Sequence, residues 1–112
     1  MNRAAPYDDI GFDELEAGLR DGTVLIVDVR EAHEFAAGHI PGSVLMPLSA
    51  FDPAEVPQAP GRTIVIACQA GVRSLSALRL AAQAGRTDIR AHYPGGFAQW
   101  RAMGAPVERG GA

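Results

Sequence analysis

Lysine is missing from this chain of 112 residues, and cysteine occurs once. All ten basic residues are arginine, which excludes Schiff-base chemistry, pyridoxal-phosphate enzymes and the lysine-dependent phosphate-binding loop. The single cysteine, Cys68, excludes an internal disulfide, a multi-cysteine zinc site and a cysteine-ligated iron–sulfur cluster. Any sulfur chemistry must therefore be the chemistry of one thiol.

Long hydrophobic runs and an excess of positive charge are also lacking. The longest apolar runs, residues 24–27 and 64–68, are far shorter than the roughly 20 residues of a membrane helix, and residues 1–9 do not resemble a secretory signal. A net charge of −3 offers little to a phosphate backbone. We expect a cytoplasmic protein with no membrane or nucleic-acid partner. His33 and His92 lack metal-ligand spacing, so we also expect no metal and no cofactor.

Strands and helices alternate along the predicted chain. Two short runs, residues 23–29 and 63–67, are almost continuously apolar and rich in β-branched residues, which is typical of strands buried on both faces of a parallel sheet. A third strand is predicted over 89–93, helices over 13–20, 31–37, 74–84 and 97–103, and a proline-rich loop over 47–61. This pattern predicts one α/β domain over residues 1–112, with its core at about 10–107.

The clearest predicted helix covers residues 74–84. Ser74 is typical of an N-cap and Gly85 of a helix end. The polar residues of this segment fall on one narrow stripe, and the others are leucine or alanine. We therefore expect Ser74 to cap the helix and most of its circumference to be buried.

Cys68 stands between the second apolar run and this helix. Open α/β sheets bind ligands at the carboxyl ends of their strands, which is where Cys68 falls. The loop of residues 69–73 is short and contains Gly71, so its backbone N–H groups can curl around the sulfur while the helix adds its positive end. Both features favour a thiolate. A lone cysteine after an apolar strand is also typical of an inert core residue, and this alternative stays open here.

Three charged residues flank this loop in the predicted fold. Arg73 lies at the start of a helix, where a cation is disfavoured by about 0.3 to 1 kcal/mol, so its position indicates an anion nearby unless the side chain extends into solvent. Asp28 and Arg30 end the first buried strand. We expect these two to pair and support the edge of the loop rather than to react.

The stretch from Cys68 to Ser74, Cys-Gln-Ala-Gly-Val-Arg-Ser, resembles the active-site loop of single-domain rhodanese-like sulfurtransferases. Further stretches resemble the motifs of that family in the same order: residues 28–30 with Glu34 and Phe35, residues 38–43, and residues 95–97 with Trp100. The resemblance covers about residues 10–107. It implies a small three-layer sandwich, with a mostly parallel five-stranded sheet flanked by helices.

The resemblance also implies a role for each loop residue. Cys68 would carry sulfur as a persulfide, and the N–H groups of the loop would cradle its terminal sulfur. The matching substrate-binding positions are Gln69, Ala70, Gly71, Val72 and Arg73. Asp28, Arg30 and Ser74 would support them.

Under this interpretation, Cys68 takes a sulfane sulfur from thiosulfate, a polysulfide or a persulfide and passes it to a thiol or to cyanide. Arg73 would bind the donor anion. The acceptor must be external because the chain has no second cysteine, and a small thiol or a protein thiol such as thioredoxin fits. Rhodaneses specialised for thiosulfate often have basic residues directly after the cysteine, whereas Gln69 and Ala70 are neutral, so a dianionic donor receives less electrostatic help.

Two other functions are compatible with the sequence. Related loops on this fold bind tetrahedral oxyanions in cysteine phosphatases and arsenate reductases, but those loops have five residues between cysteine and arginine. Only four residues separate Cys68 from Arg73. The other function is a noncatalytic binding or regulatory module, although inactive relatives usually lose the cysteine that this chain retains.

Overall fold

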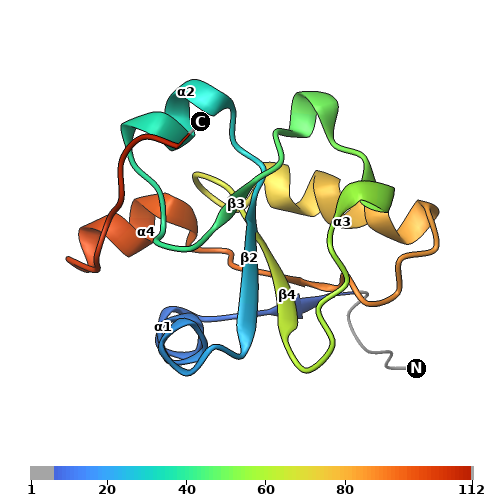
Figure 1. Cartoon of the computed structure of the whole chain (residues 1–112), viewed down its shortest axis with the longest axis horizontal. Helices are drawn as coiled ribbons and strands as arrows, with labels where there is room; N and C mark the ends of the chain where they lie inside the picture. The colour runs from blue at the N-terminus through green and yellow to red at the C-terminus, as the bar shows by residue number, and fades with distance from the viewer. Residues whose placement is uncertain (1–6, 112) are drawn as a thin grey trace.

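The computed structural model describes residues 7–111, and these residues form three layers (Figure 1). Within them a five-stranded sheet has the order β1-β5-β4-β2-β3, with every neighbouring pair parallel. The strands are β1 (Asp8–Asp9), β2 (Val24–Asp28), β3 (Val44–Leu45), β4 (Thr63–Ala67) and β5 (Ala91–His92). The helices are α1 (Phe12–Asp21), α2 (Ala32–Ala37), α3 (Arg73–Gln83) and α4 (Gly96–Ala102). The predicted α/β fold with a parallel sheet is confirmed.

Two apolar cores cover opposite faces of the sheet. Leu25 and Val27 of β2 belong to the core beneath α3, whereas Ile26 between them belongs to the core beneath α1 and α4. Figure 1 shows α3 on one side of the central strands and α1 and α4 on the other. Because helices cover both faces, β2 and β4 have continuous apolar sequences instead of alternating ones.

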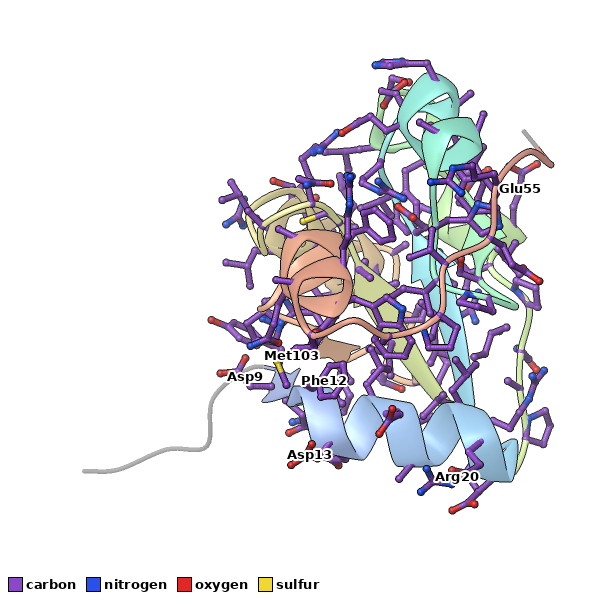
Figure 2. All side chains as sticks on the ribbon, turned by 90° about the vertical axis from the view of Figure 1, so that its left-hand side faces the viewer. Asp9, Phe12, Asp13, Arg20, Glu55 and Met103 are labelled. Carbon is purple, nitrogen blue, oxygen red and sulfur yellow. The ribbon has the colours of Figure 1, made fainter. Side chains whose placement is uncertain are left out.

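The second core is closed by α1 and α4. Trp100 of α4 is 1% exposed, its Nε1 donates to the carbonyl of Pro106 at 2.7 Å, and its ring lies 5.4 Å from that of Phe12. Figure 2 shows α1 beneath the sheet, with Asp13 and Arg20 labelled on its outer side. These two residues lie in the first and last turns, where their charges complement the helix dipole.

Helix α3 differs from its prediction in two respects. The helix begins at Arg73 with Val72 as N-cap and without a side-chain cap, so the prediction that Ser74 caps it is wrong. The Ser74 hydroxyl instead faces the interior, where it contacts Cys68 and His92. The prediction that most of the circumference is buried is also wrong, because α3 is an outer layer of the sandwich and one face is left open. Leu80, for example, is 39% exposed. The buried residues of α3 are Ser74, Ala77, Leu78 and Ala81.

The loop predicted over 47–61 contains two 3₁₀ turns, η1 (Leu48–Ala50) and η2 (Pro53–Glu55). Asp52 caps the second turn by accepting from the N–H of Ala54 at 2.9 Å. Val56 then enters the core beneath α3 and is 2% exposed. The loop therefore covers the open flank of that core. Among the described helices, none has the length and apolar character required to cross a membrane.

Candidate active site

Cys68 directly follows β4, at the sheet edge where the carboxyl ends of the parallel strands meet. The turn into α3 depends on Gly71, which has φ +84° and lies so close to Pro94 that an added Cβ would be 2.5 Å from the Pro94 carbonyl oxygen. The start of α4 holds the other side of the turn. Phe97 donates its N–H to the carbonyl of Cys68 at 2.8 Å, and Ala98 donates to that of Gln69 at 3.1 Å. The loop is thus braced from two sides.

The Cys68 sulfur is surrounded by hydrogen-bond donors. Its Sγ accepts from the backbone N–H of Gly71 at 3.1 Å and of Ser74 at 3.4 Å, and the Ser74 hydroxyl lies 3.6 Å away. Burial is the largest single influence on the thiol and raises its pKa, since Cys68 is 1% exposed. Hydrogen bonds from the Ser74 hydroxyl and from the amides of Ser74, Ala70 and Gly71 together outweigh burial, so the pKa of Cys68 is lowered from its ordinary value. The site favours the thiolate.

The remaining predicted loop residues lie around the sulfur rather than on it. Within residues 7–111, no hydrogen bond joins Sγ to Gln69, Val72 or Arg73. The Gln69 side chain accepts from Nη1 of Arg30 at 3.4 Å, and Val72 is 72% exposed at the tip of the loop. The structure therefore brings the amides of Ala70, Gly71 and Ser74 to the sulfur itself and places Gln69, Val72 and Arg73 on the rim.

Asp28 and Arg30 form a buried ion pair beneath the loop. They are 4% and 2% exposed, and Nη2 of Arg30 lies 2.8 Å from Oδ2 of Asp28. The same Nη2 donates to the carbonyl of Gly38 at 2.7 Å, and the guanidinium lies over the ring of Phe97 at 4.4 Å. Arg30 thus links the end of β2, the end of α2 and the start of α4, and these contacts stabilise the scaffold beneath the loop.

Arg73 makes a bidentate pair with Glu34 of α2. The two N···O distances are 2.7 and 2.9 Å. Hydrogen bonding from Arg73 is the main reason that the pKa of Glu34 is lowered to about 2, and the same pairing raises the pKa of Arg73. The anion that the position of Arg73 indicates is therefore a carboxylate of the protein itself.

Comparison with known proteins places this geometry in a family. Residues 12–103 match the profile of the rhodanese-like domain. The chain belongs to the rhodanese-like family. An uncharacterized protein of Synechocystis is 42% identical over 84 residues, which cover 75% of this chain and 46% of that protein. The human thiosulfate:glutathione sulfurtransferase is 32% identical over 105 residues, which cover 81% of this chain and 90% of that protein.

A solved structure shares the rhodanese-like architecture. The human single-domain sulfurtransferase superposes with a TM-score of 0.71 at 33% identity, covering 88% of this chain and 97% of that one. This chain spans about half the length of the Synechocystis relative. The predicted membership of the rhodanese-like family and the predicted rhodanese-like fold are both confirmed.

Sequence reasoning missed two side chains at this rhodanese-like site. The Ser74 hydroxyl is 2.8 Å from Nδ1 of His92, and Nε2 of His92 is 3.0 Å from Oδ1 of Asp9. A signal for His92 exists, because it falls within the strand predicted over 89–93, and a polar side chain that becomes buried there needs a partner. No such signal marks Asp9, which lies in a strand of two residues.

Proposed function

We propose that this rhodanese-like domain is a sulfurtransferase in which Cys68 carries a sulfane sulfur as a persulfide. The observation that supports this most directly is the set of polar groups on Sγ: the amides of Gly71 and Ser74, which donate to it, and the Ser74 hydroxyl, which accepts from the thiol and donates to the thiolate. These groups compensate negative charge on sulfur both before and after the sulfur is loaded. An inert core cysteine would need none of them.

The reaction has two half-reactions that balance. In the first, the Cys68 thiolate attacks the terminal sulfur of the donor, a new S–S bond forms, and the donor's bond to that sulfur breaks. The leaving group departs with the electron pair, as sulfite from thiosulfate or as a thiolate from a persulfide. In the second, an acceptor thiolate or cyanide attacks the outer sulfur and releases the Cys68 thiolate. The kinetics are ping-pong.

The charges around the loop favour an organic persulfide donor over thiosulfate. Gln69 and Ala70 bring no positive charge, and the charge of Arg73 is shared with Glu34 at 2.7 Å. Arg73 attracts the donor anion in this proposal, but its paired carboxylate reduces that attraction for a dianion. An organic persulfide such as that of glutathione carries its carboxylates several bonds away from the transferred sulfur, so it depends less on Arg73.

The acceptor is an external thiol because Cys68 is the single cysteine of the chain. A small thiol fits, as does a protein thiol such as that of thioredoxin. Both are abundant where thiols are kept reduced, so we assign the reaction to the cytoplasm.

Phosphate transfer fits the loop less well. A transferring phosphoryl group has three equatorial oxygens that need donors, whereas a persulfide has one terminal sulfur. The loop places four residues between Cys68 and Arg73, and Cys68 is 1% exposed. A noncatalytic module would need neither the thiolate nor a path for sulfur, and it differs from the enzyme in showing no turnover.

A donor panel tests the proposal. The protein is incubated with thiosulfate, an inorganic polysulfide or glutathione persulfide, and the rate of gain of one sulfur atom is followed by intact mass, with Cys68→Ser as the control. We expect Cys68-dependent loading, fastest with glutathione persulfide. A protein that gains no sulfur from any donor, yet folds, is a binding module. Loading that is fastest with thiosulfate contradicts the charge argument.

A further inference from the structure

A line of polar side chains runs from the Cys68 sulfur to the surface. The parallel pairing of β1, β5 and β4 places Asp9 beside His92 and His92 beside Ile66, two residues before Cys68. Residues aligned in this way point to the same face of a sheet, which here is the face beneath α3. Ser74, in the first turn of α3, lies over this row and contacts both His92 and Cys68.

Burial changes along the line. The side chain of His92 is 4% exposed and that of Asp9 is 68% exposed, and Ser74 is fully buried. Figure 2 shows Asp9 at the margin of the molecule. The inner members therefore have no water to replace a lost hydrogen bond, while the outer carboxylate exchanges protons with solvent.

A hydrogen bond from the Ser74 hydroxyl to a Cys68 thiolate determines where the hydrogens on Ser74 and His92 lie. The Ser74 hydroxyl has a single hydrogen, so it donates to Sγ only if its oxygen accepts from a hydrogen on Nδ1 of His92. The Asp9 carboxylate accepts only, so Nε2 of His92 must also carry a hydrogen. With all three contacts made in this direction, both ring nitrogens of His92 carry a hydrogen and the ring is an imidazolium.

A neutral His92 breaks this arrangement at a definite point. The Asp9 carboxylate keeps the remaining hydrogen on Nε2, so Nδ1 becomes an acceptor. The Ser74 hydroxyl then turns its hydrogen to Nδ1, 2.8 Å away, and no longer donates to Sγ. The thiolate then loses its hydroxyl donor and keeps the backbone amides of the loop.

We propose that His92 and Asp9 are positioning residues that direct the Ser74 hydroxyl toward the Cys68 sulfur, with His92 held as the imidazolium between them. The proposal concerns the thiolate that the proposed sulfurtransferase uses, and so it rests on that function for its purpose. Its geometry stands on the three contacts alone.

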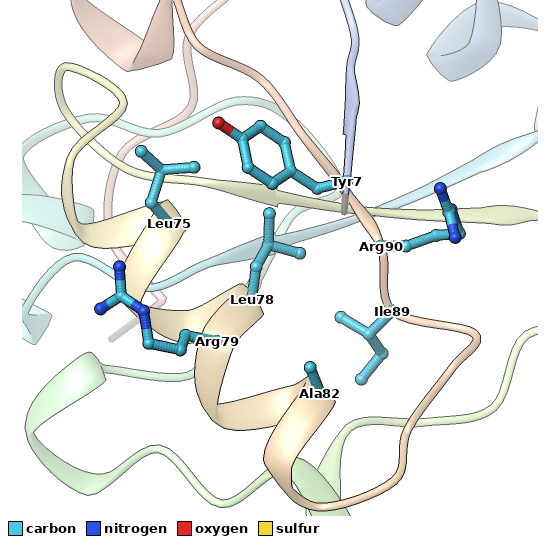
Figure 3. Close-up of a pocket in the computed structure, with 7 residues that line it drawn as sticks. All are labelled: Tyr7, Leu75, Leu78, Arg79, Ala82, Ile89 and Arg90. Carbon is cyan, nitrogen blue, oxygen red and sulfur yellow. The ribbon is translucent and has the colours of Figure 1, made fainter. Parts of the chain in front are cut away.

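The other groups around His92 are consistent with this role. The rings of Tyr7 and His92 are perpendicular, with centroids 5.2 Å apart. Figure 3 shows Tyr7 lying beside α3 in a pocket that Arg79 and Arg90 flank. Arg90, two residues before His92, is paired with Asp8 at 3.1 Å, which offsets its repulsion of an imidazolium.

Alkylation of Cys68 without any sulfur donor tests the proposal. The rate of reaction with iodoacetamide is measured against pH for the native protein and for His92→Leu, His92→Asn and Asp9→Asn, with His33→Asn as the control on an exposed histidine. His92→Leu should raise the midpoint of the pH profile by about one unit, so that about tenfold less thiolate is present below it. His92→Asn should stay close to the native profile, because its amide places a donor near the position of Nδ1. Asp9→Asn should shift the midpoint upward by less, and His33→Asn not at all.

A measurement on the native protein removes any dependence on how the variants fold. Long-range ¹H–¹⁵N correlation spectra at a pH where Cys68 is alkylated at its maximal rate should show both ring nitrogens of His92 protonated. A neutral His92 under those conditions, or His92→Leu with the native alkylation profile, overturns the proposal. Because no donor is present, these results are independent of whether the protein transfers sulfur. A protein that never forms a persulfide can still pass this test.

Discussion

Removing the charge of Arg30 is the most informative perturbation of the scaffold beneath the site. Asp28 accepts three hydrogen bonds from the guanidinium of Arg30, at 2.8, 3.1 and 3.1 Å, and one from its backbone N–H at 2.9 Å. In Arg30→Met only the backbone bond remains. Asp28 is 4% exposed, so water does not replace the lost partners, and an uncompensated buried carboxylate costs about 3–5 kcal/mol.

Urea unfolding measures this cost. With a slope of about 2 kcal/mol per molar urea, typical for a small domain, Arg30→Met should lower the midpoint by about 2 M. The double variant Asp28→Val with Arg30→Met removes both charges and should recover at least about half of the lost free energy, because a buried pair replaced by apolar groups is often close to neutral. Arg73→Met, which removes one partner of a half-exposed pair, should cost about 1 kcal/mol or less. If the single and double variants lose the same free energy, or if Arg30→Met costs no more than Arg73→Met, the buried charge is not what the scaffold depends on.

Three further predictions address the loop and its salt bridge. The pKa of Glu34 is lowered to about 2, so its pairing with Arg73 stabilises the fold above the ordinary carboxyl pKa and is lost as pH falls toward 2; the difference in melting temperature between the native protein and Glu34→Gln should therefore vanish over that range. Gly71→Ala should lower the free energy of unfolding in urea by about 1–3 kcal/mol and slow sulfur loading, because φ is +84° and the added Cβ would clash with Pro94. Gly85→Ala is the control: φ is +78° but the space around it is open, so it should cost about 1 kcal/mol and leave loading unchanged. Arg73→Ala should reduce loading from thiosulfate about fivefold more than loading from glutathione persulfide, the effect of roughly 1 kcal/mol for a partly exposed charge, and equal losses with both donors would exclude an anion-binding role.

The central strands and the place of Cys68 are predictable from sequence for a local reason. Residues 24–28 and 63–67 are buried on both faces, so nearly every side chain carries the signal. A cysteine directly after such a strand lies at the carboxyl edge of the sheet, where ligands bind, and this placement does not depend on the other elements. By contrast, β1 and β3 have two residues each, too few for any periodicity.

The features of the site that could not be predicted from the sequence depend on contacts between residues that are far apart in the chain. Arg73 at a helix start indicates an anion, but its partner Glu34 lies 39 residues away. Asp9 and His92 are 83 residues apart in the chain and meet because β1 pairs with β5 at the edge of the sheet. The Ser74 cap was wrong because capping propensity is a local preference, and the hydroxyl instead contacts Cys68 and His92 inside the fold.

The central claim is that Cys68 carries one sulfur atom between two partners, and intact mass spectrometry of a single loading and unloading cycle tests it. The native protein is treated with glutathione persulfide, freed of excess donor and then given a thiol acceptor. We expect a gain of one sulfur atom that is absent in Cys68→Ser and is lost again when the acceptor is added. No gain in mass, together with Cys68-dependent release of phosphate from an aryl phosphate, would contradict the account.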